Sequence, residues 1–265
     1  MKFIQTEMST YEIILYTMVI AAVVVFIALF YFKAGYGYLG GGNWGPQISN
    51  KTAWVLMETP ALAVMVWMLV RYILQGDSRG GNVAVYAISG LYILHYFQRS
   101  FIFPLLMRGK GRMPVSIMSM GIVFNCINAW LIGQWLFVEC PEGAYGADWF
   151  KSGYFIFGTI LFFVGMFINI QSDYIIRHLR KEGDTGHYIP DKGLYKYVTS
   201  ANYFGELVEW TGYAILSMSP AAFVFVIWTF ANLAPRSKAL TEKYIEEFGE
   251  EYESLGRKNL IPFIW

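Results

Sequence analysis

FVGMFINIQSDYIIRHLRK, residues 163–181, begins as an apolar run suited to a membrane and ends in a cluster of charges. The run contains an amide at Asn169 and a carboxylate at Asp173, and Arg180 follows near its end. At 100° per residue, these three side chains fall within about 40° of one another on a helix. A polar seam between helices would explain the amide. It does not explain Asp173, because an anion near the C-terminal end of a helix opposes the helix dipole. Asp173 therefore predicts a partner of opposite charge or a ligand.

The composition identifies the class of protein. Hydrophobic residues make up 56% of the 265 positions and charged residues 15%, whereas soluble domains contain about 25% charged residues. Apolar runs of roughly 18 residues or more are typical of transmembrane helices. The sequence predicts an all-α integral membrane bundle of seven transmembrane helices, in a single domain over residues 1–265. The predicted spans are residues 13–32, 53–74, 83–106, 115–138, 150–176, 201–218 and 221–234.

The last two predicted spans are short and are separated only by the residues "SPA". We expect them to form a tight helical hairpin, and the count falls to six if that hairpin is re-entrant. The following segment, residues 236–252, mixes acidic and basic residues and is typical of a cytosolic C-terminal helix.

The basic residues predict the orientation, because cytoplasmic loops collect Lys and Arg. If the N-terminus lies outside, one side of the membrane receives fifteen of the 20 basic residues and the other side four. The other side holds Lys2, Arg71, Arg79 and Lys151, and Arg99 lies within a span. The C-terminus is therefore expected in the cytosol.

Several classes of protein and site are disfavoured. A net charge of +1 argues against a nucleic-acid partner. Cys126 and Cys140 lack metal-ligand spacing and imply no disulfide scaffold, so no metal is expected. GYGYLG, residues 35–40, satisfies G-x-G-x-x-G, but it follows an apolar span and runs into further glycines. The dinucleotide fingerprint needs a preceding strand, so this segment is expected to be a loop and possible lid.

Ionisable groups within other spans indicate function, because they are expensive in a membrane. Glu58 is the first, and Pro60 two positions later can loosen the helix around it. A residue at the membrane interface, or one satisfied by a neighbouring helix, is the plainer interpretation. LHYFQRS, residues 94–100, places Tyr96 and Arg99 in the third span beside His95. Simple helix packing is the alternative for this cluster.

A further polar face lies in SANYFGELVEW, residues 200–210. Asn202, Glu206 and Glu209 are spaced i, i+4 and i+7, so they share one face of a helix. The two acids could pair with the arginines of the preceding segments, or bind ribose or amide groups of a ligand.

These stretches resemble the membrane steroid 5α-reductases, the 3-oxo-5α-steroid 4-dehydrogenase family, over nearly the whole chain from the second span onward. The matching stretches are AWVLMETP (53–60), LHYFQRSFIFPLLMRGK (94–110), GMFINIQSDYIIRHLRK (165–181), HYIPDKGLYKYVTSANYFGELVEW (187–210) and LIPFIW (260–265). The third and fourth are the most specific, because they are long, polar and located within spans.

The resemblance implies a seven-helix bundle that holds NADPH on the cytosolic side and a steroid nearer the bilayer. Residues 11–138 would carry the substrate and catalytic half, and residues 150–265 most of the cofactor site. The family's catalytic pair falls on Glu58 and Tyr96, and the substrate positions on Trp54 and Met57. The cofactor positions fall on Asn169, Asp173, Arg180, Tyr188, Asn202, Glu206, Arg236 and Tyr244, and Arg99 is a further candidate for the phosphates.

Three positions depart from the family pattern. Met57 stands where well-known members have Gln, and Gln98 and Leu240 each replace a His. The change at Met57 bears on contacts to the steroid carbonyl and on steroid preference rather than on the reaction.

The implied chemistry agrees with the residues. Reduction of a 3-oxo-Δ4-steroid adds hydride at C5 and develops negative charge on the carbonyl oxygen. A Tyr hydroxyl and a neutral Glu can both donate hydrogen bonds to that oxygen. The guanidinium groups suit cofactor phosphates. The proton added at C4 has no assigned donor. We expect a monomer that takes a progesterone- or testosterone-like steroid from the lipid of a bacterial inner membrane or the endoplasmic reticulum.

The sequence also allows other functions. Another membrane enone reductase, acting on a sterol or an enoyl-CoA, is the nearest alternative. An isoprenylcysteine methyltransferase-like enzyme would need no buried Glu–Tyr pair. The non-enzyme alternative is a seven-helix receptor, pump or transporter. A retinal protein would need a Lys in its last span, and a transporter should show inverted repeats; neither is found.

Overall fold

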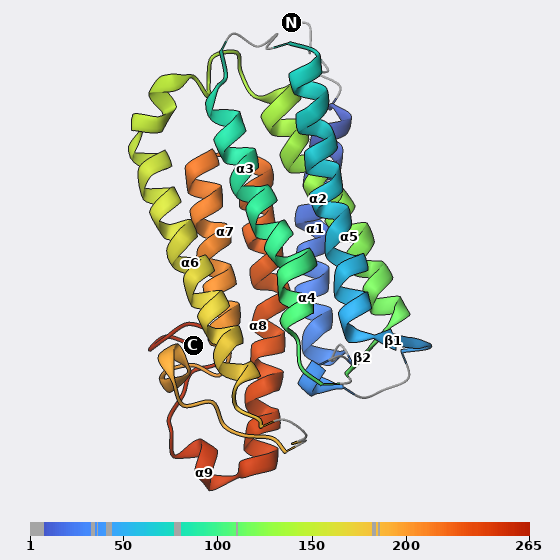
Figure 1. Cartoon of the computed structure of the whole chain (residues 1–265), viewed down its shortest axis with the longest axis vertical. Helices are drawn as coiled ribbons and strands as arrows, with labels where there is room; N and C mark the ends of the chain where they lie inside the picture. The colour runs from blue at the N-terminus through green and yellow to red at the C-terminus, as the bar shows by residue number, and fades with distance from the viewer. Residues whose placement is uncertain are drawn as a thin grey trace, which may run out of the picture.

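The helices of this chain run side by side along the long axis of the molecule (Figure 1). The computed structural model describes residues 8–32, 35, 37–40, 44–76, 81–109, 111–181, 184 and 186–265. Its helices are α1 (Thr10–Tyr31), α2 (Asn50–Leu74), α3 (Ala84–Phe97), α4 (Phe103–Leu106), α5 (Val115–Gln134), α6 (Gly153–Arg177), α7 (Ala201–Ser217), α8 (Pro220–Phe248) and α9 (Glu250–Glu253). The predicted all-helical class is confirmed.

Within the described ranges, four helical stretches are long and apolar enough to cross a membrane, which indicates a membrane protein. They are Thr10–Tyr31, Asn50–Leu74, Val115–Glu139 and Gly153–Arg177, with mean hydropathies of 3.0, 1.8, 1.7 and 2.0. The other three predicted spans are helical too, but their crossing of a membrane stays a prediction. Orientation also stays a prediction, and four residues of its charge count, Lys2, Lys33, Arg79 and Lys110, lie outside the described residues.

Two π-helical turns extend the apolar helices. One, Gln98–Ile102, joins α3 to α4, so that helical structure runs without a break over the predicted third span. The other, Trp135–Glu139, continues α5. Short π-helical turns inside α-helices are frequent at functional sites, and the first of these contains Arg99.

The turn between α7 and α8 confirms the predicted hairpin. α7 ends at Ser217 and is followed by Met218, whose φ of 45° is left-handed. The Ser219 hydroxyl then accepts a hydrogen bond from the backbone N–H of Ala222, and Pro220 opens α8. A left-handed residue followed by a cap and a proline ends one helix and starts the next within a few residues.

Two details of the predicted fold are corrected. The predicted tail, residues 236–252, is mainly helical as expected, but it continues α8 through Pro235 and is no separate helix before Gly249. In addition, strands β1 (Gln47–Ser49) and β2 (Arg112–Pro114) form an antiparallel pair in which Ile48 lies opposite Met113. Three residues per strand are too few to show the alternation that predicts strands.

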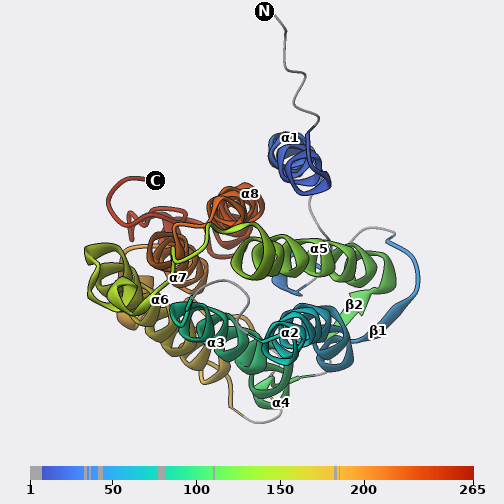
Figure 2. The ribbon, with the colours of Figure 1, turned by 90° about the horizontal axis from the view of Figure 1, so that it is seen from above.

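The closest helix packing joins α6 and α7, which lie side by side in both ribbon views (Figures 1 and 2). Gly158 and Gly165 of α6 face Gly212 and Gly205 of α7. A Cβ atom placed on Gly165 would lie 2.2 Å from the backbone nitrogen of Glu209, and one on Gly205 would lie 2.5 Å from that of Asn169. Small residues let helix backbones approach in this way in membranes. We call these four glycines the glycine seam.

Gly165→Ala tests the glycine seam. The new methyl group must push α7 away, so we expect the free energy of unfolding to fall by about 1–3 kcal/mol, the usual cost of overpacking. Thermal unfolding in detergent measures the change. Gly90→Ala on α3 is the matched control, because a Cβ there meets nothing within 4 Å. It should leave stability unchanged or raise it by up to about 1 kcal/mol. Equal unfolding temperatures for the two variants would refute the role of the seam.

Candidate active site

The two predicted catalytic side chains converge on one amide. Glu58 of α2 and Tyr96 of α3 both approach Asn125 of α5. The Asn125 Nδ2 group donates to Glu58 Oε2 at 3.3 Å, and the Tyr96 hydroxyl lies 3.5 Å from Asn125 Oδ1. Tyr96 is only 2% exposed, and Asn125 is 6% exposed. The structure therefore brings the pair together inside the bundle, facing other helices.

Aromatic side chains enclose Tyr96. Its ring centroid lies 4.6 Å from that of Tyr92, 5.0 Å from that of His95 and 5.8 Å from that of Trp210. All three are buried. A hydrogen-bond donor held in such surroundings acts more strongly on charge than it would in water.

Met57 and Trp54, the predicted substrate residues, lie on α2 near Glu58 and contact different neighbours. The Met57 side chain packs over Gly121 of α5, where an added Cβ would lie 2.5 Å from the sulfur. Trp54 faces Arg99, whose guanidinium carbon lies 4.8 Å from the indole centroid. Phe103 contacts the same guanidinium at 4.3 Å. Arg99 is thus held by two aromatic rings.

Arg99 also supplies the partner that Asp173 was predicted to need. Its NH1 group lies 3.4 Å from Asp173 Oδ2, and both side chains are buried. Arg99 interacts electrostatically with Glu206 as well as with Asp173 and Glu58. This one cation therefore connects α3 to the acidic groups of α2, α6 and α7.

The predicted polar face of α6 meets the predicted polar face of α7. Asn202 Nδ2 donates to Asp173 Oδ1 at 3.2 Å, and Asn169 Nδ2 donates to the Asn202 carbonyl at 2.9 Å. Glu206, one turn after Asn202, is partly buried on the same face. Glu209 is different, because it pairs with His95 at 2.7 Å. The sequence left an arginine partner or a ligand open for this acid; the structure pairs it with an imidazole from the third span, and the acid interacts electrostatically with Arg99 as well.

The remaining predicted cofactor residues lie toward the end of the molecule that holds α9. Arg180 is exposed just beyond α6, and it interacts electrostatically with Tyr188 and Tyr244. The Tyr188 hydroxyl donates to Asp184 at 2.7 Å. Arg236 is 8% exposed, and its Nε group donates to Tyr203 at 2.7 Å. Tyr203 follows Asn202 in the chain, so Arg236 contacts the first turn of α7 beside the network of Asn169, Asp173 and Asn202. We call this network the inner network.

A cluster that the sequence did not predict lies at this outer end. Tyr38 donates a hydrogen bond to Glu247, and His187 Nδ1 lies 2.6 Å from the same carboxyl group. The Tyr38 ring also contacts those of His187 and Tyr244, at 4.5 and 5.1 Å. Tyr38 belongs to residues 35–40, so the described part of that glycine-rich stretch is a loop held against α8, as expected of a segment that is no dinucleotide turn.

Protonation in this outer cluster follows its contacts. The Tyr38 hydroxyl, and then His187, hold the pKa of the Glu247 carboxyl below its usual range. Burial, followed by the bond to Glu247, raises the pKa of Tyr38. Burial also raises the pKa of Tyr244 to about 12. Glu247 is therefore a carboxylate that accepts from both partners at neutral pH.

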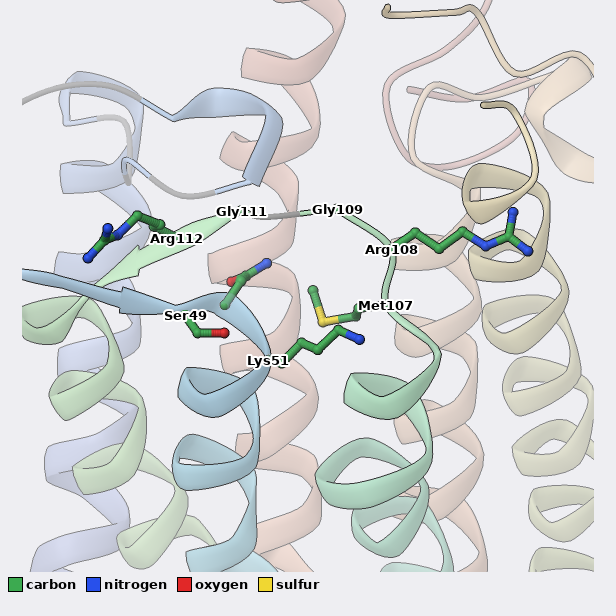
Figure 3. Close-up of a pocket in the computed structure, with 8 residues that line it drawn as sticks. Ser49, Lys51, Met107, Arg108, Gly109, Gly111 and Arg112 are labelled. Carbon is green, nitrogen blue, oxygen red and sulfur yellow. The ribbon is translucent and has the colours of Figure 1, made fainter. Parts of the chain in front are cut away.

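A surface cavity of about 450 Å³ opens where α2 and β2 begin, and its lining includes Lys51, Arg108 and Arg112. Figure 3 shows Arg108 and Arg112 extending from it in opposite directions. Arg108 donates to the Arg177 carbonyl at 3.3 Å, and Arg112 donates to the Gln47 carbonyl at 2.7 Å. The residues predicted for catalysis are not among its lining, so this cavity is separate from the converging pair.

Two functional candidates were missed from the sequence. Asn125 is an amide within a predicted span, and the rule that singled out Glu58 applies to it as well. Tyr38 gave no signal, because a tyrosine in a glycine-rich loop has no pattern. Among the described residues, no three His, Cys, Asp or Glu side chains gather as a metal site would require.

A family profile and several known proteins match this chain, and all of them point to the same enzyme family. The sequence profile of the 3-oxo-5-alpha-steroid 4-dehydrogenase family matches residues 111–265. The chain is 36% identical to 3-oxo-5-alpha-steroid 4-dehydrogenase 1 of Mus musculus, over 97% of this chain and 98% of the relative. It is 34% identical to a steroid 5-alpha-reductase of Gossypium hirsutum, over 98% and 99%. It is 39% identical to 3-oxo-5-alpha-steroid 4-dehydrogenase 1 of Homo sapiens, over 83% and 82%.

Tyr38→Phe tests the outer cluster. The change removes the donor to Glu247 but keeps the ring, so residues 37–40 should exchange amide hydrogens faster. The unfolding temperature should move little, since water can replace the lost donor at an exposed carboxylate. Tyr16→Phe, on the exposed side of α1, should change neither property. Because the pKa of Glu247 is depressed, protection in the wild type should persist from neutral pH to the ordinary glutamate value of about 4.3 and be lost only below it. Loss of protection near neutral pH would contradict this.

Proposed function

The chain belongs to the 3-oxo-5-alpha-steroid 4-dehydrogenase family, and from that premise we propose that it reduces the Δ4 double bond of 3-oxosteroids to the 5α product with NADPH. The family consists of oxidoreductases that act on CH–CH bonds. The observation that carries the finer proposal is the convergence of Glu58 and Tyr96 on Asn125 within a buried aromatic site.

Glu58 and Tyr96 are proposed to donate hydrogen bonds to the 3-oxo oxygen of the steroid. Negative charge develops on that oxygen when hydride adds to C5. Donors that are already in place stabilise this charge without reorganisation, and each is worth roughly 10²–10³ in kcat. A neutral Glu58 suits this role, because a protonated carboxyl group has an O–H to donate, whereas a carboxylate only accepts.

The residues proposed for the cofactor fit its phosphates. Ser200 precedes α7 without capping it, and its buried hydroxyl has no hydrogen-bond partner. The first turn of a helix that lacks a side-chain cap offers backbone N–H groups to anions. Arg236 is held at Tyr203 in that same turn, and guanidinium groups match phosphate geometry. The donor set is therefore the kind that a dinucleotide requires.

The inner network is proposed to orient the remaining part of the cofactor. Asn169, Asp173 and Asn202 are connected by hydrogen bonds. Arg99 pairs with Asp173 from the side of the proposed substrate residue Trp54. Glu206 lies on the same face of α7 and interacts with Arg99. Carboxylate and amide groups of this kind bind amide or ribose hydroxyl groups. When bound there, NADPH supplies the hydride that the enone accepts at C5.

The same proposal includes the membrane arrangement. It comprises seven transmembrane helices, with the N-terminus outside and the cofactor end in the cytosol. A monomer takes its steroid from the bilayer, either in a bacterial inner membrane or in the endoplasmic reticulum. The exposed large side chains of α1 and α6, such as Ile20 and Phe167 at 67% and 63% exposure, support lipid contact on their outer faces.

The direct experiment incubates the purified protein in detergent with NADPH and progesterone or testosterone. A product that has gained two hydrogens, with 5α stereochemistry, is expected from mass and product analysis. An unchanged steroid would overturn the assignment.

Glu58→Gln and Tyr96→Phe should each lower kcat by roughly 10²–10³-fold, because each weakens one donor to the developing oxyanion. Cofactor affinity, measured by fluorescence titration, should stay within about threefold of the wild type. Tyr86→Phe, an exposed tyrosine on the same helix as Tyr96, should keep full turnover. Near-wild-type kcat in both catalytic variants would refute the roles of the pair.

Arg180→Ala should weaken NADPH binding by roughly tenfold, since a charge-assisted hydrogen bond contributes about 1.5–3 kcal/mol. Arg180 is exposed, so its loss should leave the fold intact, and Lys181→Ala beside it is the control. Asp173→Ala should weaken binding too, but it also leaves Arg99 buried without this partner and should lower stability. NADH should bind more weakly than NADPH if the arginines hold the 2′-phosphate. Equal cofactor affinity in Arg180→Ala and wild type would exclude a role for this arginine.

A further inference from the structure

Asn125 contacts both members of the proposed catalytic pair, and none of the five stretches that carried the resemblance contains it. It lies on α5, whereas Glu58 and Tyr96 lie on α2 and α3. The amide on α5 therefore links a side chain of α2 to a side chain of α3. This placement raises the question of what the amide does for the pair.

The orientation of the Asn125 amide follows from the backbone. Its Nδ2 group lies 2.8 Å from the carbonyl oxygen of Met57. An oxygen at that distance from a carbonyl would be repelled, so the nitrogen must face Met57 and Oδ1 must face away from it. Pro60 lies one turn further along α2. Because a proline has no N–H, Pro60 leaves the Leu56 carbonyl without its helical donor and loosens the helix around the next residue, Met57.

This orientation determines how each partner is held. The Nδ2 group donates to Glu58 Oε2 as well as to Met57. An N–H donor makes Oε2 the accepting oxygen of a neutral carboxylic acid, so the acid proton resides on Oε1. The Asn125 oxygen accepts from Tyr96 at 3.5 Å, longer than a typical O–H···O bond. The phenol is therefore oriented, but weakly enough to turn its proton to another oxygen.

We propose that Asn125 is a positioning residue, which assigns the proton of Glu58 to Oε1 and holds the Tyr96 hydroxyl beside it so that both donors reach one steroid carbonyl oxygen. This inference rests on the proposed function. Asn125 itself does not touch the reacting atoms; it acts through Glu58 and Tyr96.

A purely structural role makes a different prediction. Asn128, one turn further along α5, is also a buried amide; it donates to the Tyr92 hydroxyl at 3.5 Å, and both groups also contact the Tyr96 hydroxyl. If Asn125 only joined helices in this way, its loss would affect every variant of the enzyme to the same extent. A positioning role requires that its effect depend on Tyr96.

The test combines Asn125→Leu with Tyr96→Phe in a double-mutant cycle. Asn125→Leu alone should lower kcat by roughly 10–100-fold and leave KM for the steroid and the affinity for NADPH within about threefold. In the Tyr96→Phe background, the additional loss should be at least about threefold smaller. Cys126→Ser, the next residue on α5 and a free thiol, should match the wild type. Equal losses in both backgrounds, or no loss of kcat, would overturn the proposal.

A vibrational measurement tests the same point without turnover. A steroid labelled with ¹³C at the 3-oxo carbon is bound with oxidised cofactor, and its carbonyl stretch is recorded. Two donors lower this frequency in the wild type, and in Asn125→Leu it should move back toward the value in apolar solvent. An unchanged frequency would contradict the proposal. If Asn125→Leu does not fold, Asn125→Asp keeps the volume and the acceptor for Tyr96 but removes the amide donor to Glu58. Its double-mutant cycle therefore uses Glu58→Gln in place of Tyr96→Phe, and the vibrational measurement is made in the same way.

The two levels of inference fail in different ways. If the wild-type protein neither binds nor reduces the steroid, the proposed function fails and the role of Asn125 fails with it. If the wild type reduces the steroid and the Asn125 variants match it, the role of Asn125 alone is wrong.

Discussion

The backbone contact between α6 and α7 is the constraint on which the rest of the site depends. The glycine seam brings the two helices close enough for an amide on one to reach a backbone carbonyl on the other, as Asn169 does with Asn202. Larger residues at the seam would separate these groups by more than a hydrogen-bond length. The buried polar network thus depends on four residues that carry no functional group, and Asp173 receives its amide partner because Gly165 and Gly205 leave room for it.

A second constraint is the compensation of buried charge. A charge that is removed from water needs partners with good geometry, and Arg99 meets this need with Asp173 and with the faces of Trp54 and Phe103. The same guanidinium interacts with Glu206 and Glu58. Arg99 therefore connects the helices that carry the proposed catalytic pair to the helices that carry the proposed cofactor residues. Neither half of the site is electrostatically complete without the other.

Much of this arrangement was predictable from the sequence, because apolar runs, buried charges and helical spacing are local signals. The helices fall close to their predicted ranges, and the conflict between Asp173 and the helix dipole predicted its partner correctly. The remainder depends on contacts between distant segments. Glu209 meets His95 because two helices cross, and no spacing within one helix could indicate that. The continuation of α8 through Pro235 was missed because a proline and a change to charged residues usually mark a helix end, whereas here packing carries the helix past both. Roles for the individual site residues remain predictions.

The strand pair β1–β2 has a consequence for depth in the bundle. α2 and α5 both begin directly after these strands and rise in the same direction from them (Figure 1). At 1.5 Å per residue, Glu58 lies about 12 Å above the first residue of α2, and Asn125 lies about 15 Å above the first residue of α5. The two strands thus give both helices a common starting level. Glu58 and Asn125 meet because they lie at similar heights above that level. Inserting one residue into either helix before this level would raise one partner by about 1.5 Å and rotate it by about 100°. The length of these first turns therefore matters to the candidate site as much as the side chains do.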